Sequence, residues 1–256
     1  MDPERPFFEH LDELRVRLRN ALLLAAGGAF AAGFSFRFLS GVVKDQLRQA
    51  FADVGHPGDF AGALVSLSPT DVVGLMFKFS LAGGLLLSLP LLLVQAWGFV
   101  SPALRAKERK VAFWMVTAGP LLFLGGFLFS FYQLMPMTAR CLLAISYYYD
   151  FVPRWTAESY YGFFLVLNLA FAACFELPLV MMVCSAVGLV DPSVYGRYRR
   201  HWIVAAFVIG GLLPPPEVVS MFIQAGALIA LYEVGIVAAR LFVPRKQALQ
   251  PQGEGQ

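Results

Sequence analysis

One long uncharged stretch constrains this chain more than any other feature of its sequence. Between Glu158 and Asp191 the only charged residue is Glu176. Residues 159–190 outnumber the roughly 20 apolar residues that cross a hydrocarbon core of about 30 Å as an α-helix. The stretch therefore predicts a transmembrane helix with a carboxylate near its middle.

Glu176 needs a physical reason to lie at this depth. A charged side chain at the bilayer centre costs about 3 kcal/mol or more, so such groups usually face a bundle interior or a water-filled cavity. Pro178 removes a backbone donor two residues later and predicts a bend beside the carboxylate. The alternative is a protonated Glu176 that hydrogen-bonds a neighbouring helix and has only a structural role. We favour a functional carboxylate, because ionisable groups inside membranes are functional by default.

The composition agrees with a membrane protein and excludes several other classes. Hydrophobic residues make up 58% of the chain, charged residues 14%, and the mean hydropathy is +0.66. The three cysteines, Cys141, Cys174 and Cys184, have neither disulfide nor metal spacing. A net charge of +3 with scattered basic residues does not suggest a nucleic-acid partner. No P-loop, Rossmann, nucleophile-elbow or zinc-helix motif is present, so we expect no catalytic residue, metal or cofactor, and no enzyme.

Six apolar segments follow one another along the chain. They cover residues 20–36, 71–100, 111–132, 159–190, 202–213 and 218–240. The fifth spans only about 18 Å at 1.5 Å per residue, because three consecutive prolines from Pro214 cannot continue it. The sixth is apolar only until it meets Tyr232 and Glu233, so we expect it to be short as well. The predicted fold class is an all-α integral membrane protein with six transmembrane helices, the fifth and sixth short.

The remaining segments complete the predicted organisation. Residues 1–243 are expected to form a single membrane domain, and the polar residues 244–256 a disordered tail. Residues 37–71 contain several Asp, Gly and Pro, which predicts short helices and turns. Residues 133–158 are interpreted as a further loop, whose aromatic side chains suit the membrane interface.

The amino-terminal residues 3–19 predict an amphipathic helix. Their apolar residues recur every three or four positions and form one stripe, while Glu9 and Glu13 fall on the opposite face. We expect this helix to lie along the membrane surface with both carboxylates turned toward water. Glu13 can also pair with Arg17 one turn later, so a merely solvated charged face remains an alternative to a binding site.

The basic residues indicate how the chain is oriented. With six spans, the amino terminus, residues 105–110, residues 197–200 and the tail share one side, which holds fourteen of the 20 Lys and Arg residues. The positive-inside rule then places both termini in the cytoplasm. No internal repeat of the kind that many secondary transporters show is evident.

Carboxylates on this cytoplasmic side indicate one kind of ligand. Glu9, Glu13 and Glu108 all fall there. Guanidinium groups form bidentate, charge-assisted bonds with carboxylates that lysine cannot copy, so paired acids suit a pair of arginines. Most surface acids are simply solvated, and this pattern alone does not decide between the two interpretations.

Five segments, taken together, resemble the TatC family, the multi-span core of the twin-arginine protein translocase. They read EHLDELRVRLRN at 9–20, LPLLLVQAWGFVSPALRAKERK at 89–110, FELPL at 175–179, LLPPPEVVS at 212–220 and LYEVG at 231–235. The resemblance implies six helices in a concave, glove-like arrangement in the bacterial cytoplasmic (inner) membrane. It also implies a receptor for signal peptides that carry an arginine pair. Folded proteins would be exported with the proton motive force, by a larger complex that contains TatA- and TatB-type single-span partners, membrane lipid and further copies of the chain.

The resemblance assigns roles to particular residues. Glu13 and Glu108 match the acids that recognise the arginine pair, and Arg15 and Phe99 match neighbours of that site. We include Glu9 as a third carboxylate of the same surface.

A second group of residues matches the family inside the membrane and near the proline turn. Glu176 matches the intramembrane carboxylate, and Glu217 the acid after the proline turn. Pro214, Met221 and Ala227 depart from the Thr, Gln and Pro that the family often has at these positions. The expected partner-helix site consists of Pro214, Glu217 and Met221. In the family this site includes a polar cluster, and here apolar packing would replace part of it.

Two rival interpretations use Glu176 differently. A proton-coupled transporter of small solutes, with Glu176 as its relay, requires a continuous route and usually repeat symmetry. An intramembrane enzyme requires a second catalytic group near Glu176, and the sequence identifies none. We favour the translocase receptor, chiefly because of the resemblance.

Overall fold

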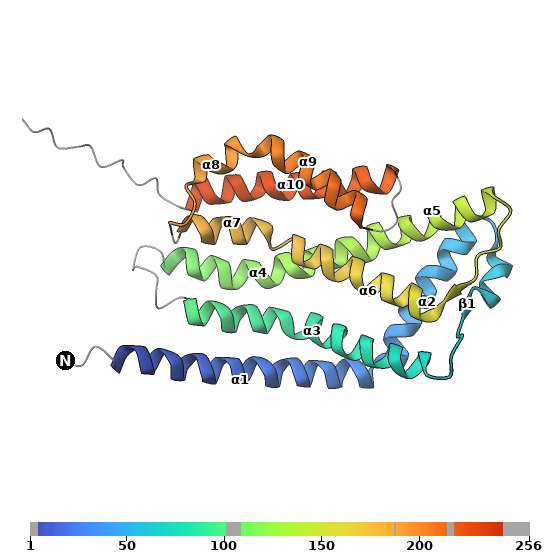
Figure 1. The fold of residues 1–256 in the computed structure, drawn as a ribbon, viewed down its shortest axis with the longest axis horizontal. Helices are drawn as coiled ribbons and strands as arrows, with labels where there is room; N and C mark the ends of the chain where they lie inside the picture. The colour runs from blue at the N-terminus through green and yellow to red at the C-terminus, as the bar shows by residue number, and fades with distance from the viewer. Residues whose placement is uncertain (1–4, 101–108, 187, 214–217, 243–256) are drawn as a thin grey trace, which may run out of the picture.

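A computed structural model describes residues 5–100, 109–186, 188–213 and 218–242; at 5–13, 93, 96–100, 109–117 and 242 it describes the backbone alone (Figure 1). The elements of the first half are α1 (Arg5–Phe34), α2 (Phe36–Asp53), η1 (Pro57–Gly62), β1 (Leu64–Val65), α3 (Asp71–Val100), α4 (Arg109–Phe129) and η3 (Ser130–Leu134). The second half contains α5 (Met135–Tyr148), β2 (Trp155–Thr156), α6 (Ala157–Cys174), α7 (Leu177–Ala186), α8 (Pro192–Arg197), α9 (Arg199–Leu212) and α10 (Val218–Phe242). The long helices run side by side, with α8 at one end of the bundle and α2, η1 and the tip of α5 at the other. We call these the α8 end and the α2–α5 end.

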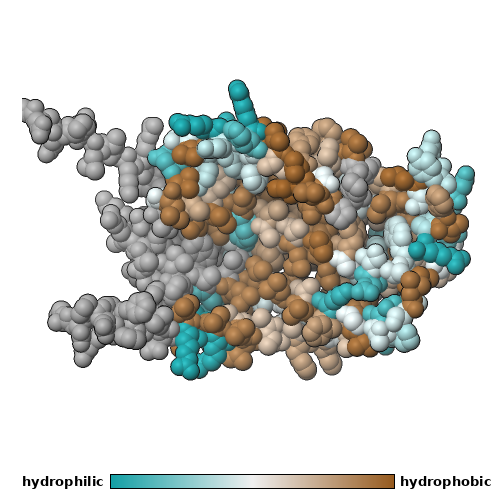
Figure 2. Space-filling model, in the orientation of Figure 1, coloured by the Kyte–Doolittle hydropathy of each residue, from teal (hydrophilic) through white to brown (hydrophobic). Residues whose placement is uncertain are grey.

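The described helices include enough apolar length to cross a membrane several times. Among the described residues, four spans pass on length and composition, and a fifth passes if the bent α1–α2 pair counts as one. Large apolar side chains point outward along the bundle, for example Phe30, Phe77 and Val208. Figure 2 shows hydrophobic surface over the middle of this face and hydrophilic residues toward the two ends. An apolar middle with polar ends is the pattern of a protein surrounded by lipid, so the predicted all-α integral membrane fold is confirmed.

The amino-terminal helix differs from the prediction in one respect. We expected a surface helix at 3–19 that ends before the first span, but α1 is one uninterrupted helix from Arg5 to Phe34. The chain bends by 66° only at Ser35, where α2 begins. The α2 helix and the 3-10 turn η1 confirm the short helices that were predicted between the first two spans.

The third span also extends further than expected. Residues 133–158 were predicted to be a loop, yet the chain passes from α4 through a π-helical turn, η3, into α5 and remains helical to Tyr148. Pro136 has no N–H to donate within this continuous helix, and the Phe131 carbonyl oxygen five residues earlier accepts from Gln46 Nε2 of α2 at 2.9 Å. Leu143 of α5 packs with Leu47 and Phe51 of α2, and all three are fully buried. Burial against α2 therefore stabilises a helix that local composition did not indicate.

Two loops at the α2–α5 end form the only strands among the described residues. Leu64 pairs with Trp155 and Val65 with Thr156 in a parallel ladder. The Trp155 amide also donates to the Ala63 carbonyl oxygen at 2.8 Å. The ladder connects the loop before α3 to the loop before α6, and it is a small exception to an otherwise all-α fold.

The last two spans differ in length. The helix α9 has 14 residues and is short, as predicted, whereas α10 has 25 and is not. The expectation of a short sixth helix was wrong because Tyr232 and Glu233 do not interrupt it. The Tyr232 hydroxyl donates to the Tyr195 carbonyl oxygen at 2.9 Å, and Glu233 accepts from Arg199 at 2.6 Å. Both polar side chains find partners while their backbone stays helical.

Candidate functional site

The residues matched to the arginine-pair site belong to elements that meet at the α8 end. Glu9, Glu13 and Arg15 lie in the first half of α1, and Phe99 lies in the last turn of α3 (Figure 1). Glu108 lies outside the described residues, directly before the first residue of α4. The Arg15 side chain is exposed, whereas the side chains of the other helical members are not among the described ones.

Close packing aligns α1 with α3 in an antiparallel register. A Cβ atom added to Gly84 would lie 2.3 Å from the Ala29 Cα atom, so a side chain there would separate the helices. Small residues of this kind let membrane helices approach closely. Gly28 of α1 also contacts Gly84 of α3. Arg17 lies eleven residues before Gly28, and Gln95 lies eleven residues after Gly84. At this level Arg17 Nη1 donates to the Gln95 carbonyl oxygen at 3.2 Å.

The same register extends one helical turn further toward the α8 end. Four residues before Arg17 in α1 is Glu13, and four residues after Gln95 in α3 is Phe99. Because both helices are continuous there, their backbones bring Glu13 and Phe99 to the same level. The predicted pair between Glu13 and Arg17 involves a side chain outside the described set, so it stays a prediction.

Glu176 lies at a break between two helices. The chain leaves α6 at Cys174, turns through Phe175 and Glu176, and resumes as α7 at Leu177. Pro178 explains the break because it has no N–H for the Cys174 carbonyl four residues earlier. The bend predicted beside the carboxylate is therefore confirmed.

The surroundings of Glu176 favour a role beyond a structural hydrogen bond. Both of its carboxylate oxygens are buried, and neither has a hydrogen-bond partner among the described residues. The helix α4 packs tightly against the same turn, since a Cβ atom on Gly126 would lie 2.7 Å from the Phe175 Cβ atom. A buried polar group without a partner costs about 1–3 kcal/mol. Among the described residues, the carboxylate thus has hydrogen-bonding capacity that no neighbour uses.

Sequence analysis missed several other buried polar side chains. Gln224 is fully buried in α10, and both of its amide heavy atoms lack a partner among the described residues. Asn168 in α6 uses its amide nitrogen on the Phe164 carbonyl oxygen at 2.8 Å, and its own oxygen is unpartnered. Ser130 and Thr138 also bury hydroxyls that find no partner in the described part of the chain. A search for every polar residue within apolar runs, and not only for charged ones, would have found them.

The expected partner-helix site is only partly described. Pro214 and Glu217 lie outside the described residues, and Met221 lies in the first turn of α10 with a half-buried side chain. The Met221 sulfur would be 3.5 Å from a Cβ atom on Gly211, so it packs inside the α9–α10 pair. Ala227 packs against the main hydrophobic core. Among the described residues, no cluster of His, Cys, Asp and Glu could hold a metal ion.

Comparisons with known proteins identify the family. The model of the family "Sec-independent protein translocase protein (TatC)" matches residues 9–226. The chain is similar to TatC of Aquifex aeolicus, 30% identical over 246 residues that cover 96% of this chain and 99% of that one. It is also similar to TatCy of Bacillus subtilis, 32% identical over 234 residues, 91% of this chain and 87% of that one.

Solved structures give the same answer. A crystal structure of the twin-arginine translocase receptor TatC superimposes with a TM-score of 0.75 at 30% identity, covering 91% of this chain and all of that one. A second TatC crystal structure gives 0.74 at 29% identity. These matches do not support the small-solute transporter, and they identify a transport family without enzymatic activity. The chain belongs to the TatC family of Sec-independent protein translocase proteins.

Proposed function

We propose that this chain is the signal-peptide receptor and core subunit of a twin-arginine translocase in a bacterial inner membrane. The main support is the register of α1 and α3, in which the backbones of Glu13 and Phe99 reach the same level at the α8 end. Glu108 directly precedes α4, which begins at the same end. Acids from two separate segments would thus face one arginine pair, and each guanidinium would receive a bidentate carboxylate.

The distribution of basic residues supports a cytoplasmic location for this end and for both termini. The segments on this side hold fourteen of the 20 Lys and Arg residues. Arg15 and Glu9 would flank the bound peptide, Arg15 with an exposed guanidinium that limits how many further cations can approach. A lysine pair would bind more weakly, because an ammonium group cannot form the bidentate contact.

Glu176 and the α9–α10 pair would serve the later steps of export. In this proposal TatA- and TatB-type single-span proteins dock near Pro214, Glu217 and Met221, and a polar group of a partner helix reaches Glu176. Several copies of the chain would assemble with these partners, and the proton motive force would drive the passage of folded precursors.

Site-specific crosslinking to a signal peptide tests the receptor function. Glu13→Gln and Glu108→Gln should each lower crosslinking of an arginine-pair peptide at least about tenfold, since a charge-assisted hydrogen bond is worth about 1.5–3 kcal/mol. Asp45→Asn is a matched control, because this exposed acid lies in α2 at the opposite end of the bundle and pairs with Arg48, one turn away, at 3.7 Å.

The control and the peptide separate specific from general effects. Asp45→Asn should bind as the unaltered chain does, and a lysine-pair peptide should discriminate little between the unaltered chain and Glu13→Gln. Undiminished crosslinking in both glutamate variants, with the protein still in the membrane, contradicts the receptor assignment.

A further inference from the structure

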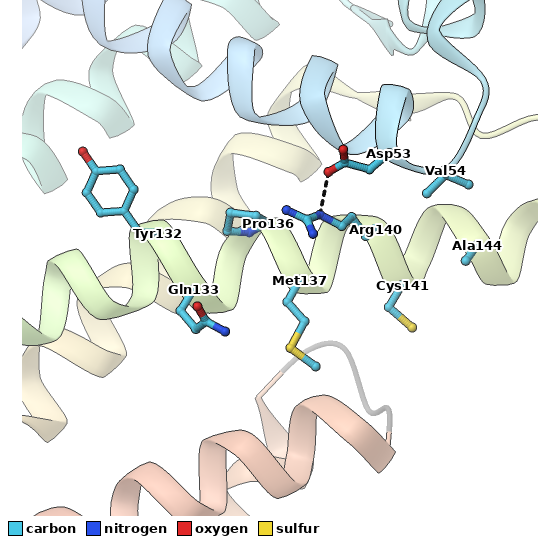
Figure 3. A pocket seen from close by; sticks show the side chains of 9 residues that line it. All are labelled: Asp53, Val54, Tyr132, Gln133, Pro136, Met137, Arg140, Cys141 and Ala144. Atoms are coloured by element: carbon cyan, nitrogen blue, oxygen red, sulfur yellow. Dashed lines mark ion pairs between the residues drawn. The ribbon is translucent and has the colours of Figure 1, made fainter.

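A pocket at the α2–α5 end is not explained by signal-peptide recognition. It has a volume of about 540 Å³, in the range of small-molecule sites, and lies against the outer part of α5 (Figure 3). Its walls come from the end of α2, the π-helical turn η3 and α5. The lining residues are Asp53, Val54, Tyr132, Gln133, Pro136, Met137, Arg140, Cys141 and Ala144.

The short fifth helix leaves this part of α5 uncovered. With 14 residues, α9 is about 21 Å long at 1.5 Å per residue, less than a hydrocarbon core of about 30 Å. Figure 1 shows α9 and the start of α10 ending before the tip of α5. Lipid of the leaflet at the α2–α5 end can therefore reach the outer part of α5.

The polar part of the pocket contains one charge of each sign. Arg140 Nε lies 2.9 Å from the Asp53 carboxylate, and both side chains are about half exposed, at 53% and 47%. Figure 3 shows the two side chains meeting across the gap between α5 and α2. The two Nη atoms of Arg140 and the second carboxylate oxygen of Asp53 lie outside this contact in Figure 3. Arg140 can therefore also bind an anionic group, and Asp53 can also bind a cationic group.

The other side of α5 in the pocket is mostly apolar. Met137, Cys141 and Ala144 follow one another at helical spacing and form a stripe along α5. Met137 and Cys141 point away from the ion pair, toward the side of α9 and α10 in Figure 3. The stripe runs past the level of the ion pair, with Ala144 toward the tip of α5 and Met137 one turn toward the middle of the bundle, the direction in which a lipid chain would run.

We propose that this pocket binds a zwitterionic phospholipid with a primary ammonium headgroup. The phosphate contacts the Arg140 guanidinium, the ammonium group contacts Asp53, and an acyl chain covers the Met137 stripe beyond the tip of α9. A purely anionic headgroup is disfavoured because it would carry its negative charge to Asp53 without a compensating cation. A soluble anion gains nothing from the apolar stripe. The proposal depends on the membrane location of the chain and is independent of the signal-peptide site.

Native mass spectrometry of the full chain in mild detergent tests the proposal. The probes are phosphatidylethanolamine and phosphatidylglycerol with identical acyl chains, titrated separately. The unaltered chain should retain the first at least about tenfold better, the equivalent of one charge-assisted hydrogen bond. Arg140→Gln should weaken both lipids, since each presents its phosphate to this guanidinium, and should leave the preference in place. Asp53→Asn should lose the preference, because the ammonium group loses its partner and the carboxylate that repels phosphatidylglycerol is gone.

Arg48→Gln is the matched control. Arg48 is exposed in α2, as Asp53 is, but it pairs with Asp45 and lies over the Phe60 ring outside the pocket. This variant should bind both lipids as the unaltered chain does. Arg140→Lys keeps the positive charge if the Gln variant does not fold, and it should keep the direction of the preference.

Three results would overturn the proposal. The first is equal retention of the two lipids by the unaltered chain. The second is an Arg140→Gln profile that matches Arg48→Gln. The third is a crosslink from position 137 to a co-purified single-span protein with no lipid retained, which would assign the pocket to a partner helix.

Discussion

The α1–α3 pair and the α9–α10 pair are both antiparallel, yet different forces hold them together. In α1–α3 the backbones approach so closely that glycine is required, as the 2.3 Å from a Gly84 Cβ to the Ala29 Cα shows. In α9–α10 side chains form the specific contacts: Trp202 Nε1 donates to the Leu228 carbonyl oxygen at 3.2 Å, and Arg199 pairs with Glu233. Backbone contact through glycine is therefore closest in α1–α3, whereas α9–α10 adds polar side-chain contacts to its packing.

The two pairs also differ in what they bury. The α9–α10 pair encloses Gln224, a fully buried amide without a partner among the described residues. Ser88 is buried in α3, but its hydroxyl donates to the Gly84 carbonyl oxygen of its own helix at 2.7 Å. Among the described residues, α1–α3 leaves no buried side-chain polar atom without a partner, whereas α9–α10 leaves the Gln224 amide unsatisfied, which costs stability.

The largest effect should come from filling the closest contact of α1–α3. Gly84→Leu should destabilise the protein by about 3 kcal/mol or more, because the added side chain collides with the Ala29 backbone. Gly74→Leu in the same helix is the control, since nothing lies within 4 Å of its Cβ position. Thermal unfolding in detergent measures both. Equal unfolding temperatures for the two variants would show that α1–α3 does not depend on close packing.

An intermediate effect of opposite sign should come from Gln224. Gln224→Leu should stabilise the isolated chain by about 1 kcal/mol, because it removes a buried amide that lacks partners. Gln49→Leu, at an exposed position of α2, should change the unfolding temperature little. An export assay on both variants shows whether the amide is kept for a partner: higher stability with lower export supports that role. A destabilised Gln224→Leu would mean that the amide is already satisfied within the chain.

The smallest effect should come from the ion pair between α9 and α10. Arg199→Gln and Glu233→Gln should each cost about 0.5 kcal/mol, because both side chains are nearly half exposed. The double variant should cost little more than either single one, because each single variant already removes the interaction between the two side chains. Urea unfolding of the four proteins of the cycle measures the coupling. A coupling well above 1 kcal/mol would mean that the pair is shielded from water and that α9–α10 depends on it.

The predictions from sequence succeeded where the signal is local. The boundaries of α3 at Asp71 and Val100 coincide with the predicted second span, because a long apolar run with an Asp in its first turn defines a helix by itself. Pro178 correctly predicted the break at Glu176, since a proline acts on its own helix.

The failures occurred where distant contacts override local composition. The helix α5 continues through residues interpreted as a loop because α2 buries Leu143. The helix α10 continues past Tyr232 because Tyr195 and Arg199 receive its polar side chains. Neither partner can be inferred from the composition of the segment itself.

The candidate site divides in the same way. From charge, topology and a family resemblance, the sequence predicts that Glu13 and Glu108 lie on one side of the membrane. The resemblance assigned Glu13 and Phe99 to one site, but only the structure shows the register that brings α1 and α3 to the same level there, because register between two helices depends on which small residues face each other.

By itself the sequence determined a bundle of membrane helices, their order, a short fifth helix and a carboxylate at midspan. It could do so because a membrane helix satisfies its backbone within itself, which leaves length and hydropathy as sufficient signals. Only the tertiary structure decided the lengths of α5 and α10, the register of α1 on α3 and the meeting of Asp53 with Arg140. Those features depend on contacts between residues far apart in the chain, and packing alone brings such residues together.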